Sequence, residues 1–236
     1  MGILIAFLSN YLLSGIGEND WRYMMGVEAI PAIIYTLLVF SIPKSPRWLY
    51  LNNQEHLAEI IIKEAYSKDD ADELISEILK DKESSFKSES IFQKKYSFIL
   101  TLAFLVAAFN QFSGINAFLY YAPRIFEEGG LGQNAALLNS VGIGLTNLIF
   151  TFIGINLIDK LGRKVLMYIG SIGYIMSLTL ISLSFILEWG RIALPIFLFL
   201  FIASHAIGQG AIIWVYISEI FPNHIRSYGQ SFGIST

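Results

Sequence analysis

The sequence predicts an all-α protein that crosses a membrane several times, and three observations support that prediction. Apolar residues make up 54% of the 236 positions, against roughly 45–50% in ordinary soluble domains. Apolar runs recur along the chain at about 20 residues each, which is enough to cross a hydrocarbon core of roughly 30 Å. Basic residues gather between alternate runs, as they do in cytoplasmic loops.

Six apolar runs are expected to be membrane helices, and a seventh begins near the end of the chain. They cover residues 2–16, 23–42, 98–121, 135–158, 165–187 and 193–217, and the seventh covers 227–236. An amphipathic stretch, PRIFEEGG, follows the third run. Met1 could begin a signal peptide, but no basic region precedes the first run and no small-residue cleavage site follows it. A membrane helix is therefore favoured there.

The placement of charge predicts the orientation. The intervals 43–97, 159–164 and 218–227 hold 13 of the 16 Lys and Arg residues, and the opposite side holds Arg22, Arg124 and Arg191. Nine of these 13 lie in the long first interval, so part of the excess belongs to a solvated domain. The short loop KLGRK indicates the same orientation by itself. All three intervals are thus expected in the cytoplasm.

The long loop between the second and third runs has its own organisation. Ser45 before Pro46 is typical of an N-cap followed by a proline at the first helical position, so a short helix RWLYLN is expected. Two charged amphipathic helices follow, the second capped by Asp69 or Asp70, and SSFKSES forms a polar linker. The expected apolar faces are Leu57, Ile60 and Ile61 on the first helix and Leu74, Ile75, Ile78 and Leu79 on the second.

Amide side chains interrupt the third apolar run, in NQFSGINAFLYY. Unpaired amides are costly in lipid, so Asn110, Gln111 and Asn116 need partners. On a regular helix Gln111 and Asn116 would be about 140° apart, and Gly114 could bring them together by letting the helix unwind. Amides suit an uncharged polyhydroxylated ligand, because each offers two donors and an acceptor. Packing between helices is an equally open explanation.

Other polar and aromatic residues in the runs are ambiguous when taken singly. Tyr120 and Tyr121 near the outer interface fit an aromatic belt, or a lid over a site. Asn147 lies mid-span among small residues. Trp214, roughly one turn from the cytoplasmic end of its run, fits an interfacial anchor. His205 is deeper, and packing is favoured over ligand binding for it.

Two cytoplasmic loops, DKLGRK and SEIFPNHIR, carry opposed charges. Ion pairs between them could act as a latch if only one conformation forms them. Helix capping and orientation signals are the alternative explanation. The charged residues concerned are Asp159, Arg163, Lys164, Glu219 and Arg226.

Several functional classes are excluded. There is no cysteine, the three histidines (His56, His205 and His224) are scattered, and no nucleophile, metal or phosphate-binding motif occurs, so neither an enzyme nor a cofactor is expected. The basic residues form no stripe with aromatic neighbours, so no nucleic-acid partner is expected. The glycines of GIG and GQG, inside apolar runs, are expected to serve helix packing.

Taken together, PKSPRWL, NQFSGIN followed by YY, DKLGRK and SEIFPNHIR resemble the sugar porter family of the major facilitator superfamily, in the family's order and spacing. The resemblance implies a partial major facilitator fold. Residues 1–42 would end the N-terminal bundle as helices five and six, and residues 43–97 would form the intracellular helical domain. Residues 98–236 would form part of the C-terminal bundle, with helices seven to ten and the start of the eleventh.

The resemblance also implies roles for individual residues. Sugar would be bound by Gln111, Asn116, Asn147 and Trp214, with Asn110 standing where the family has the first residue of a Gln-Gln pair. Tyr120 and Tyr121 would form the outer gate. Arg47, Asp159, Arg163, Lys164, Glu219 and Arg226 would form the intracellular gate. Lys44 departs from the usual Glu, and His205 lies in a stretch that is usually aromatic or small.

The function implied by the resemblance is transport of a hexose, pentose or polyol by alternating access, with H+ as a possible coupling ion. The protein would be multi-pass in a plasma or inner membrane, with the lipid bilayer around it. Helices one to four, most of the fifth and the twelfth are absent, so the chain is expected to be a fragment that is inactive alone. Any coupling carboxylate is expected in those segments. A sugar sensor that does not transport remains the alternative.

Overall fold

Helices are the only regular elements in the computed structural model, which describes residues 1–85, 90–189, 192–222 and 225–235. The predicted all-α fold is confirmed. Arg191, His224 and residues 86–89 of the predicted linker lie outside the described residues. The helices are α1 (Gly2–Leu13), α2 (Asp20–Val27), α3 (Ala29–Val39), α4 (Pro46–Leu51), α5 (Glu55–Ala65), α6 (Lys68–Ser85), η1 (Lys94–Tyr96), α7 (Ser97–Phe112), α8 (Ile115–Tyr120), α9 (Ala122–Glu128), α10 (Gln133–Leu161), α11 (Arg163–Ile186), α12 (Ala193–His205), η2 (Ala206–Gly210), α13 (Ile212–Ile220) and α14 (Arg226–Ile234).

Five helical stretches within the described residues are long and apolar enough to cross a membrane. They are Asp20–Val39, Lys94–Tyr120, Gln133–Leu161, Arg163–Ile186 and Ala193–Ile220. These stretches match five of the six predicted runs. The first run is also helical, but α1 is shorter and ends at Leu13, and α14 lies where a seventh run was expected.

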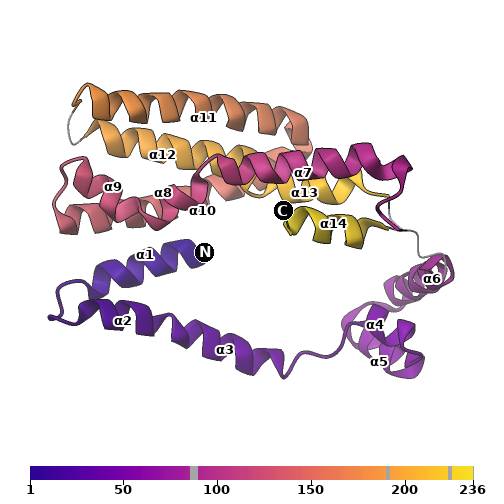
Figure 1. The fold of residues 1–236 in the computed structure, drawn as a ribbon. Coiled ribbons are helices and arrows are strands. Elements are labelled where there is room, and N and C mark those ends of the chain that lie inside the picture. Colours follow the sequence, from indigo (N-terminus) through magenta and orange to yellow (C-terminus); the bar gives the residue numbers. More distant parts are fainter. Residues whose placement is uncertain (86–89, 190–191, 223–224, 236) are drawn as a thin grey trace.

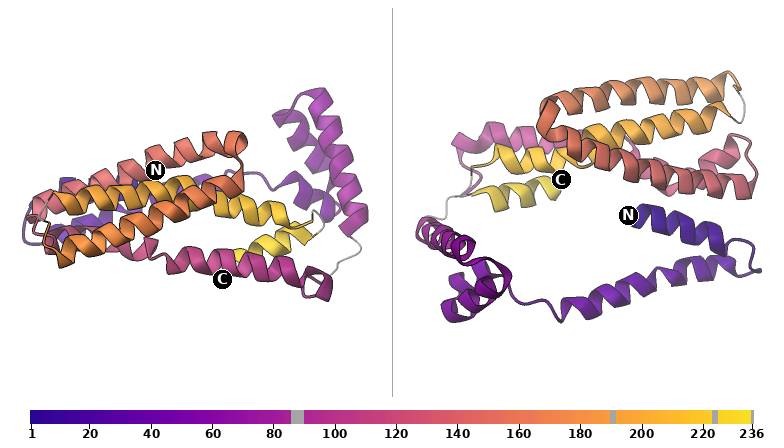
Figure 2. Two further views of the ribbon diagram at one scale, coloured as in Figure 1. Left: turned by 90° about the horizontal axis from the view of Figure 1, so that it is seen from above. Right: turned by 180° about the vertical axis from the view of Figure 1, so that it is seen from behind.

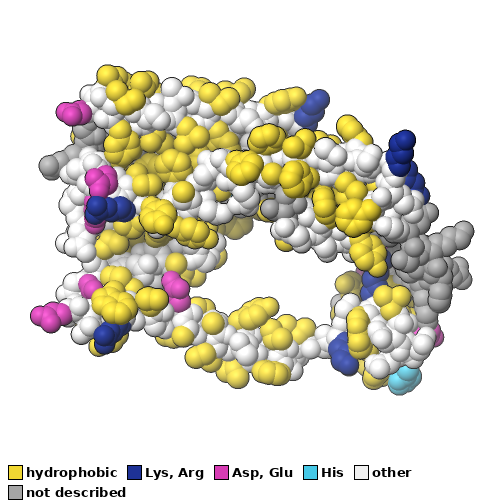
Figure 3. All heavy atoms as spheres, in the orientation of Figure 1, with side chains coloured by type: hydrophobic (Ala, Val, Ile, Leu, Met, Phe, Trp, Pro, Cys, Tyr) yellow, Lys and Arg dark blue, Asp and Glu magenta, His cyan; other side chains and the backbone are white. Residues whose placement is uncertain are grey.

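The helices form three groups (Figure 1). α7–α14 make a bundle with α11 beside α12, α4–α6 form a small cluster at one end, and α1–α3 run along the other side. The view from above in Figure 2 shows α4–α6 projecting beyond the end of the bundle. α1 packs on α10, and no residue of α1, α2 or α3 is fully buried. Figure 3 shows the opening that results between α3 and the bundle.

Glycines let the bundle helices approach closely, as GIG and GQG predicted. A Cβ on Gly170 of α11 would lie 2.6 Å from the Cα of Gly208 in η2, and one on Gly144 of α10 would lie 2.7 Å from the Cα of Leu4 in α1. Both separations are shorter than real Cβ contacts, so these backbones touch only because side chains are missing. The predicted packing role is confirmed for these two motifs.

The cluster α4–α6 has a core of its own, formed by Leu49, Tyr50, Ala58, Ile62, Ala71 and Ile78. Pro46 opens α4 as predicted, with Ser45 before it. The predicted face of α5 was wrong for Leu57 and Ile60, which are exposed, and right for Ile61, which is half-buried against the core. The side of α5 that meets α4 carries Ala58 and Ile62 instead, so the cluster buries that side.

The cap predicted for α6 was also wrong. α6 begins at Lys68, so the residue before it is Ser67. The Asp70 backbone N–H donates to Ser67 Oγ at 3.4 Å, and Ser67 Oγ donates to the Asp70 carboxylate at 2.6 Å. Asp70 is thus the third helical residue, and it pairs with the capping residue Ser67 instead of forming the cap itself.

Candidate functional site

The third apolar stretch breaks at Gly114, between α7 and α8. Gly114 has φ +80° and ψ 10°, which is the left-handed region that favours glycine. A Cβ at this position would meet only the Phe118 ring, at 3.9 Å, so the backbone conformation and not space calls for glycine. Across the break, Asn116 Nδ2 donates to Gln111 Oε1 at 2.8 Å. The predicted unwinding and convergence are confirmed.

The amide pair keeps most of its hydrogen-bonding capacity for a ligand. Both Gln111 and Asn116 are exposed. Gln111 retains its two N–H donors, while Asn116 retains one N–H and its carbonyl oxygen. Three donors and an acceptor therefore converge at the break. Such a mixed set matches hydroxyl groups, which both donate and accept.

Asn110 is placed differently from the amide pair. It is 4% exposed and lies on the buried face of α7, in line with Ala103 and Ala107. Its Oδ1 is buried and has no hydrogen-bond partner among the described residues. The structure therefore does not bring Asn110 to the exposed amides.

Trp214 and Asn147 lie on two other helices of the bundle, α13 and α10. Trp214 is 38% exposed in the first turn of α13, which packs against α7. It lies six residues before Ile220, farther from the helix end than expected, because the helix continues past residue 217. Asn147 is half-buried in α10, and its side chain has no hydrogen-bond partner in the described part of the chain. Tyr120 and Tyr121 are 77% and 64% exposed, where α8 gives way to α9.

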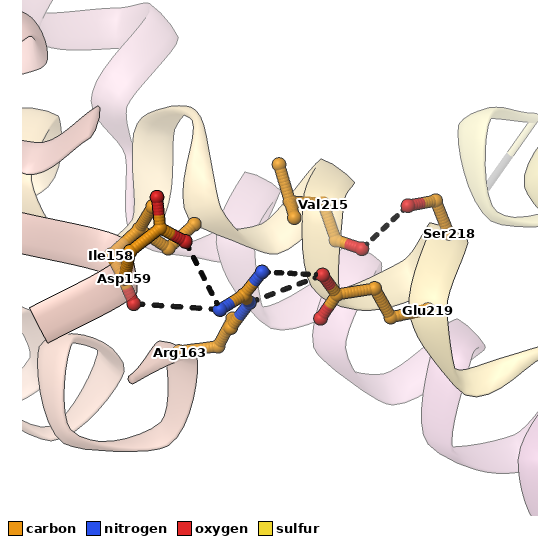
Figure 4. A network of polar contacts seen from close by, with 6 residues as sticks. All are labelled: Ile158, Asp159, Arg163, Val215, Ser218 and Glu219. Atoms are coloured by element: carbon orange, nitrogen blue, oxygen red, sulfur yellow. Dashed lines mark hydrogen bonds and ion pairs between the residues drawn. The ribbon is translucent and has the colours of Figure 1, made fainter. Parts of the chain in front are cut away.

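Arg163 gathers part of the predicted charge network (Figure 4). Its Nη2 and Nε donate to Glu219 Oε1 at 2.7 and 3.1 Å, and its Nη1 lies 3.6 Å from Asp159 Oδ1 and 3.5 Å from Ile158 O. The arginine thus ties the turn between α10 and α11 to α13. Lys164 instead lies over the Tyr168 ring at 5.9 Å.

The two remaining predicted gate residues lie on other helices. Arg226 opens α14, and Arg47 lies on α4 in the separate cluster. Three of the six predicted gate residues, Asp159, Arg163 and Glu219, are therefore brought together.

Two polar features escaped the sequence reasoning. Glu28 lies between α2 and α3, inside the apolar stretch Asp20–Val39, and it is exposed. The sequence alone could have revealed Glu28, because a carboxylate inside an apolar run is costly in lipid and indicates a functional role. The second feature is a hydrogen bond between the Tyr174 hydroxyl and His205 Nδ1, two residues 31 positions apart. No group of three or more His, Asp and Glu side chains in the described ranges could hold a metal ion.

The whole chain, residues 1–236, matches the model of a family described as "Sugar (and other) transporter". It is 36% identical to the glucose transporter GlcP of Staphylococcus epidermidis, over 100% of this chain and 53% of that protein. It is 30% identical to the D-xylose-proton symporter of Escherichia coli, over 99% of this chain and 49% of that protein. The chain thus spans about half the length of these curated relatives.

The fold agrees with a solved structure of the proton:xylose symporter XylE bound to 6-bromo-6-deoxy-D-glucose. The TM-score is 0.82 at 30% identity, covering 98% of this chain and 50% of that one. The similarity to about half of that structure supports a partial major facilitator fold.

Proposed function

The chain belongs to the sugar transporter family, and we propose that it forms part of a membrane transporter that binds a small neutral sugar at the helix break and releases it by alternating access. The observation that carries the proposal is the hydrogen-bonded amide pair Gln111–Asn116, held at a glycine break inside a membrane stretch. Broken membrane helices commonly form the binding sites of secondary transporters. The unused donors and acceptor of the pair suit a polyhydroxylated, uncharged ligand. Glucose and xylose, named for two relatives, are ligands of this kind.

The roles proposed for the other residues follow from their positions. Trp214 would offer its exposed ring to the sugar, Asn147 would add an amide, and Tyr120 and Tyr121 would cover the site from outside. The contacts of Arg163 with Glu219 and Asp159 would hold the inner end closed. Residues 43–97 would lie in the cytoplasm, as the basic residues indicate.

Proton coupling is proposed through Glu28, in place of the expectation that a coupling carboxylate lies only in segments outside this chain. This carboxylate is the acidic group in the middle of an apolar stretch, and a protonated carboxyl is far less costly in lipid than an ionised one. The xylose relative is named a proton symporter, so a protonatable group is expected in such a transporter.

The test uses the protein from the complete open reading frame, reconstituted in proteoliposomes with labelled D-xylose, D-glucose or L-arabinose. Wild type should exchange one of these sugars in counterflow, and Gln111→Ala and Asn116→Ala should each lose that exchange. Glu28→Gln should keep counterflow but lose accumulation driven by a pH gradient. Sugar binding without counterflow would favour a sensor, and unchanged exchange in both amide variants would refute the site.

A further inference from the structure

A groove of about 370 Å³ opens between the start of α7 and α14. One wall is the α7 face that carries Leu100 and Phe104, and the other is the Phe232 ring of α14. The Phe92 ring, just before η1, meets Phe232 edge to face with centroids 6.2 Å apart. In Figure 1, α14 lies beside the half of α7 that leads to α4–α6. Aromatic and aliphatic side chains therefore make up both walls of the groove.

The two hydroxyl groups that line the groove are already bonded to the backbone of their own helical stretch. Ser97 Oγ donates to Lys94 O at 2.9 Å, and Thr101 Oγ1 donates to Ser97 O at 2.9 Å. Both hydroxyl hydrogens are used in this way, so neither requires a polar partner from the groove. An occupant therefore meets a surface that suits a hydrocarbon chain.

The groove is about as long as one leaflet of a membrane. It begins at Lys94, where the membrane stretch Lys94–Tyr120 also begins, and its lining reaches Phe104 on α7. A rise of about 1.5 Å per residue gives roughly 15 Å between these two positions. That is half of a hydrocarbon core of roughly 30 Å. A membrane helix needs a contact face along the whole core, so this length fits a lipid tail better than a helix.

The mouth of the groove is positively charged. Lys94 lines it, is exposed and forms no ion pair with any described residue. Lys95 follows in η1, and Arg226 opens α14. The described segments 90–112 and 225–235, which form the groove, contain no Asp or Glu. This end of the bundle is the one proposed to face the cytoplasm, where the leaflet is rich in anionic lipids, so a negatively charged headgroup is complementary to it.

We propose that this groove binds an anionic phospholipid of the inner leaflet, with one acyl chain against Leu100 and Phe104 and the phosphate beside Lys94. The bound lipid links α7, which carries Gln111 of the amide pair, to α14. The inference goes beyond the proposed function, because it assigns a second ligand at a site that does not contact the sugar.

The test measures phospholipid binding by native mass spectrometry in detergent, using protein from the complete open reading frame. Phosphatidylglycerol, which is anionic, is compared with phosphatidylcholine that has the same acyl chains. Wild type should bind one phosphatidylglycerol about fivefold more tightly, which is the factor that one lysine near a membrane surface contributes. Glycerol 1-phosphate carries the phosphate without a chain, so it should not displace the lipid at equal concentration.

Two variants separate the headgroup contact from the chain contact. Lys94→Gln should lower the affinity for phosphatidylglycerol about fivefold, to that of phosphatidylcholine. Thr101→Trp places a large ring in the groove, so it should weaken the binding of both lipids. Lys160→Gln is the matched control, because it removes the charge of an exposed lysine at the same predicted cytoplasmic end, outside the groove lining. It should keep the wild-type affinities.

Equal affinity of wild type for the two lipids would overturn the inference, as would a loss in Lys160→Gln as large as that in Lys94→Gln. Displacement by glycerol 1-phosphate would indicate a phosphate site without a chain and would also overturn it. A wild type that binds no phospholipid would show that another segment fills the groove, with the same consequence. If Thr101→Trp fails to fold, the two lysine variants decide, because both side chains are exposed. Sugar counterflow is measured separately, so failure here leaves the proposed function intact.

Discussion

Replacing Gly114 by alanine should weaken sugar binding through the backbone alone. A left-handed residue with a side chain costs roughly 1–2 kcal/mol, and no clash adds to this, because the nearest atom to a Cβ is 3.9 Å away. A penalty of that size reduces the population of the broken helix about 5- to 30-fold relative to a straightened one. In a straightened helix Gln111 and Asn116 face different sides, so the apparent affinity for sugar falls by up to the same factor.

The assay is equilibrium sugar binding to Gly114→Ala, Gly114→Asn and Gly132→Ala in protein from the complete open reading frame. Asparagine tolerates the left-handed region better than alanine, so it should recover part of the affinity. Gly132 has φ −70° and no atom within 4 Å of its Cβ position, so alanine there should change nothing. Equal affinity of Gly114→Ala and wild type would refute the reasoning, as would an equal loss in Gly132→Ala.

Three further predictions concern stability. Gly208→Ala should destabilise the protein by about 3 kcal/mol or more in detergent, because its Cβ would lie 2.9 Å from Leu166 O and press on Gly170. Gly26→Ala is the control, because the space around Gly26 is open. Equal melting temperatures for the two variants would contradict this prediction. Arg163→Lys should lower the free energy of unfolding by about 0.5–1 kcal/mol and make the melting temperature less sensitive to salt. The reason is that lysine cannot make both hydrogen bonds to the half-exposed Glu219. Unaltered salt sensitivity would count against the contact. Ser67→Ala should lower the free energy of unfolding by about 1 kcal/mol and speed hydrogen exchange at the Asp70 amide, because that amide loses its bond to Ser67 Oγ. An unchanged exchange rate would exclude the cap.

The membrane helices and the break at Gly114 could be predicted because their causes are local. Length and apolar content define a span, and a glycine between amides marks a place where a helix can open. The charge contact between Arg163 and Glu219 was also predictable, because both sit in short loops at the same predicted end of the bundle.

The features that escaped prediction depend on neighbours distant in sequence. Nothing within AIGQG distinguishes a π-helical turn from an α-helical one, and the fit of Gly208 against Gly170 is visible only once α11 lies beside it. The three isoleucines of α5 look equivalent in sequence, and contact with α4 decides which one is buried. The partnership of Tyr174 with His205 likewise requires the packing of two helices.

The central claim is that the amide pair at the break binds the sugar. A double-mutant cycle on Gln111→Ala and Asn116→Ala, read out as equilibrium sugar affinity, tests it most directly. Each single variant should lose about tenfold in affinity, and the double variant should lose clearly less than the product of the two, because the side chains are bonded to each other and act as a unit. Wild-type affinity in both single variants, with the protein folded, would contradict the account.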